Sequence, residues 1–254
     1  WIRALTFIEL LINLISKIYC SMGGGYLVYM ILGGIGTVVG MILSARLKSK
    51  FNHYSQVGLH SRLSGKEVAE KMLKDNGIYD VQVISVDGFL SDHYNPGNKT
   101  VNLSPDVFNG RSVAAAAVAA HECGHAVQHA TSYAMLKFRS AIVPVVQFAA
   151  TAQQFLLMLA LGVLGATGNS TILLITIIAF FITTVFSIIT LPVEFDASNR
   201  ALAWLDSSGI AYGEEHAGAK DALWWAAMTY VAAALSSLAM LVYLVLRYVG
   251  MNRD

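Results

Sequence analysis

The residues best suited to chemistry are two histidines and a glutamate close together on one predicted helix. His121, Glu122 and His125 form an HExxH sequence within the alanine-rich segment 113–131. Because side chains four positions apart lie on the same face of a helix, both imidazoles can bind one metal ion. Glu122 lies beside them, where it can take a proton from a zinc-activated water without being a ligand. The spacing therefore predicts a Zn²⁺ site with Glu122 as general base.

Two histidines leave such an ion short of ligands, since catalytic zinc usually has three protein ligands and one open position. Thiolates are poor candidates, because Cys20 and Cys123 show no paired spacing. A carboxylate is therefore needed.

Glu194 is the best candidate for this carboxylate. It is the first charged residue after the stretch 140–193, which has no Asp, Glu, Lys or Arg. Pro192 suits the first turn of a helix, which would place Glu194 near the start of a helix that extends to about residue 206. Asp196 would then face another side of this helix.

The composition places the chain in a membrane. Of 254 residues, 56% are hydrophobic and 13% are charged, against about 25% charged in a soluble domain. The net charge of +1 offers no surface for nucleic acid. Residues 18–45, 140–193 and 222–246 lack charge, and each stretch exceeds the roughly 18 residues typical of a spanning helix. Because 140–193 is too long for one span, we expect a turn at 167–170.

The predicted fold is mainly α-helical and integral to the membrane, with about four transmembrane helices and a small cytoplasmic α+β domain inserted between the first and second spans. The predicted spans lie near residues 26–45, 142–166, 171–189 and 224–246. Along the chain we expect an amphipathic or extension segment (1–21), a transmembrane helix (22–45), the inserted domain (46–139), a transmembrane hairpin (140–193), a cytoplasmic helix with the third ligand (194–221), and a last transmembrane helix with the C-terminal tail (222–254).

Basic residues indicate the orientation. Arg46, Lys48 and Lys50 follow the first span, and Lys137 and Arg139 precede the second, whereas the loop between the second and third spans has none. The positive-inside rule therefore predicts a cytoplasmic location for the inserted domain. The first apolar segment has no basic region followed by a small-residue cleavage site, so we expect no cleavable signal peptide.

Within the inserted domain, the sequence predicts three helices and two or three short strands. A capping box formed by Ser64 and Glu67 starts the first helix, and Gly77 ends it. The predicted helices are 65–74, 105–109 and 113–131, and the strands include 81–86 and 100–103.

Three motifs carry a family resemblance: the HExxH sequence, the segment 194–198 after a membrane hairpin, and the segment 91–96 ahead of a strand. Together they resemble the YugP-like family of membrane zinc metallopeptidases, over about residues 26–254. The resemblance implies a zincin-like inserted domain in a multi-pass protein of the bacterial inner (cytoplasmic) membrane. It also implies His121, His125 and Glu194 as zinc ligands and Glu122 as general base.

The same resemblance implies that Thr100, Val101 and Asn102 lie in an edge strand that binds substrate beside the cleft. The family is similar, at a distance, to the HtpX and CAAX prenyl proteases, whose ligand glutamate begins a Glu-x-x-x-Asp pattern. Ser198 occupies the aspartate position here, which leaves open what supports the ligands. Asp196 is one candidate.

The predicted function is a zinc metalloendopeptidase acting near the cytoplasmic membrane face. Its expected partners are a peptide or membrane-protein substrate and the lipid bilayer, with a membrane protein complex as a further candidate and no nucleic acid. Two alternatives stay open. One is a site-2-type intramembrane protease, because residues 113–135 are apolar enough to be suspected of spanning. The other is a non-catalytic zinc-binding subunit of a membrane complex, motivated by residues 1–21 and by Ser198.

A few other residues have weaker claims. His129 lies one turn beyond His125, so we expect it to support the site or lie on the surface. Cys123 is expected to pack rather than to react. His93 and His216 are both candidates for stabilising an oxyanion.

Overall fold

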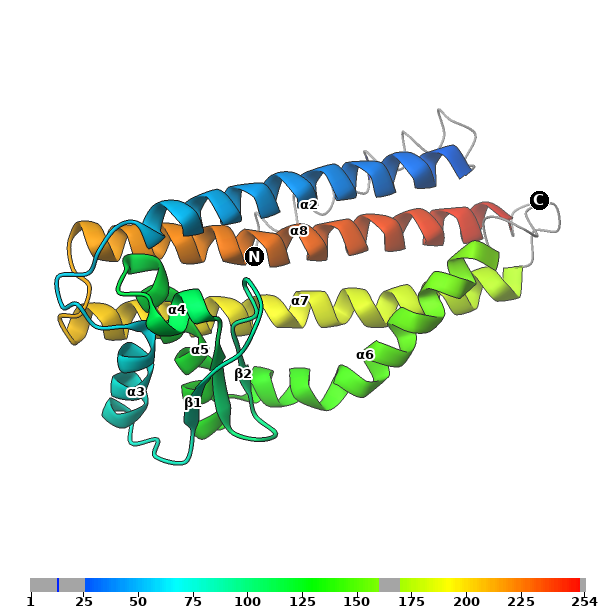
Figure 1. Cartoon of the computed structure of the whole chain (residues 1–254). Coiled ribbons are helices and arrows are strands. Elements are labelled where there is room, and N and C mark those ends of the chain that lie inside the picture. The colour runs from blue at the N-terminus through cyan, green and yellow to red at the C-terminus, as the bar shows by residue number, and fades with distance from the viewer. Residues whose placement is uncertain (1–12, 14–25, 160–169, 252–254) are drawn as a thin grey trace. The chain divides into compact units, whose positions relative to one another are not determined.

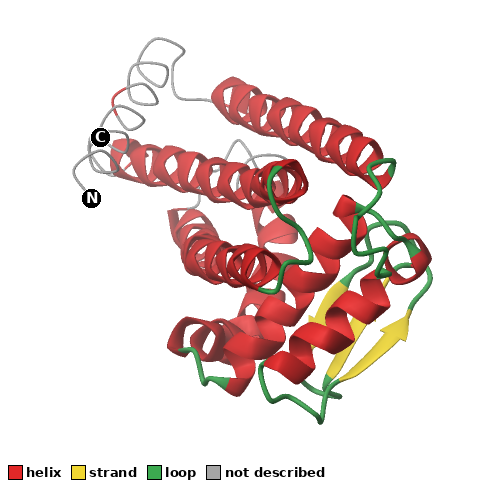
Figure 2. Cartoon of the chain, turned by 90° about the vertical axis from the view of Figure 1, so that its left-hand side faces the viewer, coloured by secondary structure: helices red, strands yellow, loops and turns green. Residues whose placement is uncertain are grey.

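The computed structural model describes residues 26–159 and 170–251, together with Asn13. The predictions for residues 1–21 and for the turn at 167–170 therefore lie outside the described residues, apart from Asn13 and Ser170. The described part is mainly helical with one small sheet (Figures 1 and 2). In chain order, its elements are α2 (Tyr26–Ser55), α3 (Gly65–Asp75), β1 (Gln82–Ser85), β2 (His93–Asn95), β3 (Thr100–Leu103), α4 (Pro105–Asn109), α5 (Val113–Ala130), α6 (Ala134–Met158), α7 (Ser170–Ser207) and α8 (Glu214–Met251).

The chain divides into two compact units. The first, here called the apolar unit, comprises Trp1–Met41, Arg139–Ile189 and Tyr230–Asp254. The second, here called the α+β unit, comprises Ile42–Phe138 and Thr190–Thr229. Helices α2, α6, α7 and α8 are long and apolar enough to cross a membrane. The expectation of about four membrane-spanning helices and a small sheet is confirmed at this level.

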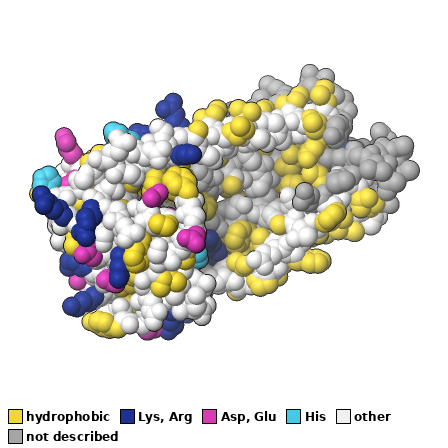
Figure 3. All heavy atoms as spheres, in the orientation of Figure 1, with side chains coloured by type: hydrophobic (Ala, Val, Ile, Leu, Met, Phe, Trp, Pro, Cys, Tyr) yellow, Lys and Arg dark blue, Asp and Glu magenta, His cyan; other side chains and the backbone are white. Residues whose placement is uncertain are grey.

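The apolar unit has a lipid-compatible exterior. A small cluster that includes Val28, Phe180 and Tyr243 is buried between its helices, whereas Met41 and Phe148 are 68% and 78% exposed. On the face shown in Figure 3, charged side chains gather over the α+β unit, and the helices of the apolar unit present hydrophobic ones. Such an exterior is costly in water and stable in hydrocarbon, which favours a membrane location.

Helix α7 corrects one prediction. Pro192 does not begin a helix, because α7 continues from Ser170 to Ser207 with this proline in its interior. Proline removes a backbone N–H and normally bends or ends a helix. Here the residues that follow are held by packing, since Val193, Ala197 and Ala201 are fully buried. The burial of these apolar side chains offsets the cost of the proline, so Glu194 lies within a long helix rather than near its start.

The sheet corrects a second prediction. The strand order is β1-β3-β2, with β1 parallel and β2 antiparallel to β3. Thr100, Val101 and Asn102 therefore lie in the central strand and are buried, not in an edge strand. The sequence prediction did not include a separate strand at His93–Asn95 (β2). This short strand takes the edge position that Thr100 to Asn102 had been given.

Helix α5 lies in the core of the α+β unit. Ser112 caps its first turn by accepting a hydrogen bond from the backbone N–H of Ala115 at 3.2 Å. Most of its alanines belong to the main buried cluster, together with side chains of α3, β3 and α4. Within the described residues, α5 is not among the helices that could span a membrane. This packing disfavours the site-2-type intramembrane alternative.

Helices α5 and α7 approach each other at a glycine. A Cβ atom added to Gly124 would lie 2.5 Å from the carbonyl oxygen of Ala197. A side chain at this position would force the two backbones apart. Because Gly124 neighbours His125 and Ala197 lies close to Glu194 in sequence, this contact sets the separation of the predicted ligands.

We predict that Gly124→Ala destabilises the α+β unit, although glycine to alanine in a helix normally stabilises by about 1 kcal/mol. Overpacking of a close contact costs about 1–3 kcal/mol. Thermal unfolding in detergent measures the effect. Gly40→Ala is the matched control, since Gly40 is also helical and a Cβ there would meet nothing within 4 Å. A melting temperature for Gly124→Ala equal to or above that of the control contradicts the close approach.

Candidate metal centre

Three side chains from α5 and α7 converge on one point inside the α+β unit. Nε2 of His121 lies 3.4 Å from Oε2 of Glu194, and Nε2 of His125 lies 3.6 Å from the same oxygen. One ligand atom from each residue lies within 4.8 Å of the other two. Zinc bonds of about 2.0–2.1 Å in tetrahedral geometry separate neighbouring ligand atoms by about 3.3 Å. The three side chains therefore fit a single zinc ion.

These ligand atoms lie in a buried environment. Glu194 is 3% exposed and His125 is 8% exposed. Burial by itself would lower the pKa of His125, but the hydrogen bond to Glu194 and the negative charges of Glu122 and Glu194 raise it above its usual value. Two carboxylates so close to the imidazoles make the site strongly attractive to a cation. A divalent metal ion would satisfy the carboxylates and both imidazoles together.

A fully buried glutamine orients His125. Oε1 of Gln128 lies 3.0 Å from Nδ1 of His125, while Nε2 of Gln128 donates hydrogen bonds to the carbonyl of Val193 and to Oδ2 of Asp196, both at 2.8 Å. Because the amide nitrogen is used on α7, the amide oxygen faces the imidazole. Nδ1 of His125 must then carry the proton, which leaves the lone pair of Nε2 for the metal.

Ser198 supports the other histidine. Its hydroxyl lies 3.1 Å from Nδ1 of His121. The residue that departs from the Glu-x-x-x-Asp pattern is therefore in direct contact with a ligand. Asp196 is not part of the ligand group, but its carboxylate reaches His125 through Gln128, which agrees with its expected role as a candidate support for the ligands. Arg200 in turn donates to Asp196 at 2.6 Å.

Glu122 lies outside the three-ligand group and contacts the sheet. It is 8% exposed, and its Oε2 accepts a hydrogen bond from the backbone N–H of Tyr94 at 2.9 Å. Asp92 lies nearby and accepts hydrogen bonds from the N–H and hydroxyl of Ser104. Burial raises the pKa of Asp92 despite these bonds, and the charge of Glu122 adds to the increase. Glu122 is thus held between α5 and β2, beside the candidate metal ligands.

The weaker candidates lie outside the ligand group. Nδ1 of His129 is 2.7 Å from the hydroxyl of Tyr94, so this histidine supports β2. Cys123 is fully buried, and burial raises the pKa of its thiol well above the usual value, which confirms its packing role. His93 is exposed and pairs with the carbonyl of Ser91. Its suggested role at an oxyanion stays a prediction. Gln128 is the residue that sequence reasoning missed, although a glutamine three positions after a ligand histidine was a usable signal.

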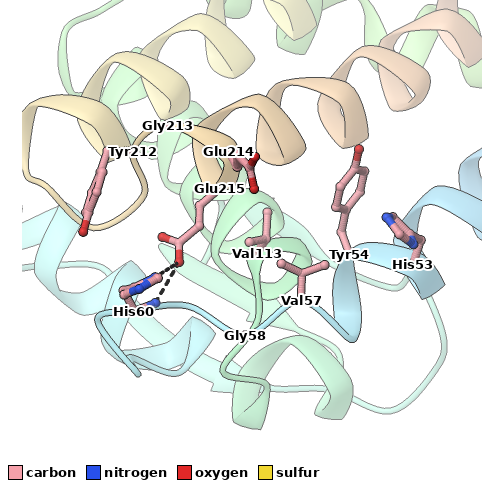
Figure 4. Close-up of a pocket in the computed structure, with 10 residues that line it drawn as sticks. All are labelled: His53, Tyr54, Val57, Gly58, His60, Val113, Tyr212, Gly213, Glu214 and Glu215. Atoms are coloured by element: carbon pink, nitrogen blue, oxygen red, sulfur yellow. Dashed lines mark hydrogen bonds and ion pairs between the residues drawn. The ribbon is translucent and has the colours of Figure 1, made fainter.

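Apart from the candidate metal centre, a cavity in the α+β unit is also lined by histidines and glutamates (Figure 4). Its volume is about 530 Å³, and Val113 lines it, eight residues or about 12 Å before His121 along α5. Oε1 of Glu215 accepts from the N–H of His60 at 2.9 Å and pairs with the His60 ring at 2.8 Å. This pair ties the loop after α2 to α8. Among the described residues, only His121, His125 and Glu194 form a metal-ligating group.

Comparison with known proteins gives a consistent assignment. Residues 29–249 match the family described as "Putative neutral zinc metallopeptidase". The chain is 45% identical over 195 residues to the "Putative membrane protease YugP" of Bacillus subtilis (strain 168). The aligned region covers 76% of this chain and 84% of that protein. No solved structure matches.

We predict that Glu194→Ala abolishes stoichiometric zinc binding, because two imidazoles alone leave the ion under-coordinated. Metal analysis of the purified protein after dialysis measures this loss. Glu214→Ala is the control, since Glu214 lines the cavity at His60 and Glu215. This substitution should leave the zinc content unchanged. Undiminished zinc in Glu194→Ala, or loss of zinc in Glu214→Ala, would place the third ligand elsewhere.

We also predict that Ser198→Ala weakens zinc binding about 10- to 100-fold, as is typical when an outer hydrogen bond to a ligand histidine is removed. Competition with a fluorescent chelator gives the affinity. Ser207→Ala serves as the control, because Ser207 is exposed on the same helix and contacts only the local carbonyl of Trp204 among its described bonds. Equal affinities for both variants would mean that the Ser198 hydroxyl does not orient His121.

Proposed function

The chain belongs to the neutral zinc metallopeptidase family, and we propose that it is a membrane-embedded zinc endopeptidase that hydrolyses peptide bonds. The observation that carries the proposal is the convergence of His121, His125 and Glu194 to distances that suit one zinc ion, with buried Glu122 beside them. His121, His125 and Glu194 would hold the zinc ion, which when bound would supply acidification of a water molecule and polarisation of a peptide carbonyl.

The chain's own residues supply proton transfer. Glu122 acts as general base, taking a proton from the attacking water and later passing it to the nitrogen of the leaving amine. Its Oε2 is held by the Tyr94 N–H, which fixes the carboxylate toward β2. Gln128 and Ser198 keep the imidazoles in the orientation that presents Nε2 to the metal.

We infer that substrate adds to β2 rather than to β3. Strand β3 is paired on both of its sides, whereas β2 is an edge strand. The backbone N–H of Tyr94 in β2 points toward Glu122 and not toward β3. An extended peptide beside such a strand is read by its main chain, with weak preference for side chains. In this arrangement Thr100, Val101 and Asn102 position β2 from behind. The side-chain amide of Asn102, for example, donates to the carbonyl of His93 at 3.2 Å.

The proposed location is the cytoplasmic face of the bacterial inner membrane. Its support is the basic residues that flank the first and second spans, such as Arg46 and Arg139. Glu194 follows closely after Ile189, the last residue of an apolar-unit segment. Substrates near the bilayer, such as membrane proteins and their cytoplasmic segments, therefore suit the site, either alone or within a membrane protein complex.

We predict that Glu122→Gln retains zinc but lowers the cleavage rate by about 10²- to 10⁴-fold, the usual contribution of a general base. Purified wild type and variant are incubated with unfolded proteins, and new N-termini are counted by mass spectrometry. Glu70→Gln, on the surface of α3, should cleave at the wild-type rate.

The outcomes separate the proposal from the non-catalytic alternative. Full activity in Glu122→Gln removes Glu122 from the mechanism. A wild-type protein that holds zinc but cleaves no substrate in this mixture, or in one of membrane proteins, favours a structural zinc subunit.

A further inference from the structure

The loop between β1 and β2 exposes two large apolar side chains on the α+β unit. Phe89 is 48% exposed and Leu90 is 41% exposed. Leu90 has a φ of 56°, a left-handed conformation that is unfavourable for a leucine. Gly88 also has a positive φ, and the hydroxyl of Ser91 donates to its carbonyl at 3.1 Å. The loop is thus closed into a turn that leaves both apolar side chains accessible, which is unfavourable in water.

This loop is fixed to one level of α2. The ring of Phe89 packs edge-on against Phe51, with centroids 5.6 Å apart. Nζ of Lys48 lies 5.5 Å from the centroid of the Phe89 ring. All three residues belong to the α+β unit, and the course of the loop can be followed in Figure 1. Phe89 therefore lies beside the part of α2 that contains Lys48 and Phe51.

That level corresponds to the headgroup layer of a bilayer. Arg46 is the first charged residue after the uncharged stretch of α2, and it marks the end of the hydrocarbon region. At 1.5 Å per residue, Lys48 and Phe51 lie only about 3 Å and 7.5 Å further along the helix. The headgroup layer on each side of the hydrocarbon is about 5–7 Å thick. Phe89, which contacts both residues, falls within this layer.

We propose that the β1–β2 loop is a lipid-binding anchor, in which Phe89 and Leu90 insert into the membrane interface. Aromatic side chains prefer this zone, where the ring is partly in contact with apolar chains. Lys48 lies beside the loop, and both Lys48 and Arg46 are exposed on this part of α2 and can bind the phosphates of anionic lipids. A lipid surface explains together the exposure of the two apolar side chains, the neighbouring positive charge and the level on α2.

The anchor is connected along the chain to the proposed active site. The effect of the anchor on catalysis rests on the proposed function. The loop leads directly to Asp92, which holds the backbone of Ser104, and then to β2, whose Tyr94 N–H binds Glu122. Insertion of the loop would fix the proposed substrate strand at the membrane surface. Peptide segments emerging from the bilayer would then meet β2 before soluble ones.

Spin labelling in liposomes tests the anchor without measuring peptidase activity. Leu90→Cys is labelled with a nitroxide in a Cys20→Ser background. The remaining cysteine, Cys123, is fully buried and should not react with the label. The collision rates of the nitroxide with oxygen and with a water-soluble nickel complex are then compared. Tyr212→Cys is the control, since Tyr212 is 56% exposed and precedes α8, whose first residue, Glu214, lies eight residues, or about 12 Å, before the uncharged stretch of this helix. Melting temperatures confirm that both variants are folded.

We expect the ratio of oxygen to nickel collisions to be several-fold higher at position 90 than at position 212. Equal ratios, or a label at position 90 shielded from both reagents, overturn the anchor. The coupling to the site is tested separately with Leu90→Asp. This variant should cleave a membrane-tethered peptide several-fold more slowly than wild type and the same free peptide at an unchanged rate. Equal losses on both peptides overturn the coupling.

Discussion

The candidate metal centre depends on the close approach of two helices that are far apart in the sequence. HExxH supplies two imidazoles on one face of α5, but this alone is an incomplete site. The third ligand comes from α7, and α7 reaches the histidines because Gly124 leaves no side chain between the two backbones. The alanines around Gly124 have the same effect along the rest of α5, since their small side chains let neighbouring elements pack closely against it. The composition of α5 is thus a condition for the chemistry as well as for the fold.

The two candidate ligand histidines are oriented by different hydrogen-bond partners at Nδ1, which are Gln128 for His125 and Ser198 for His121. His125 is oriented by an amide that is itself fixed by a carbonyl and a carboxylate of α7, so its proton position is set by a chain of three groups. His121 has a single hydroxyl, which can accept from Nδ1–H and rotate as required. A hydroxyl is a weaker acceptor than a carboxylate and adds no charge to a site that already contains Glu122 and Glu194. Asp196 acts on the other histidine, since its carboxylate reaches His125 through the amide of Gln128.

Local patterns predicted the site well, and long-range packing limited the prediction. The HExxH spacing, the capping box at Ser64 and the uncharged stretches are decided within a few residues, and the helices they predict are present. Pro192 was misjudged because its cost is offset by buried neighbours that no local rule contains. The strand β2 was missed because it is only three residues long and Tyr94 is its one residue with a strong strand preference, so pairing with β3 holds it in place. Gln128 was missed because its role exists only once α7 lies against α5.

The position of Glu194 is fixed by contacts inside the α+β unit. The carbonyl of Val193 and the carboxylate of Asp196 both accept hydrogen bonds from Gln128 of α5, and the backbone of Ala197 meets Gly124. Elsewhere in the same unit, the C-terminal end of α2 is bound to α8 through Asp221, which contacts Lys50 at 2.7 Å and the hydroxyl of Tyr54 at 2.8 Å. Because the contacts of α7 with α5 surround Glu194 in sequence, the distance between this carboxylate and the two imidazoles is set by the packing of α5 against residues 193–198 of α7. The backbone contacts that hold these two helices together are therefore also what fixes the geometry of the candidate metal ligands.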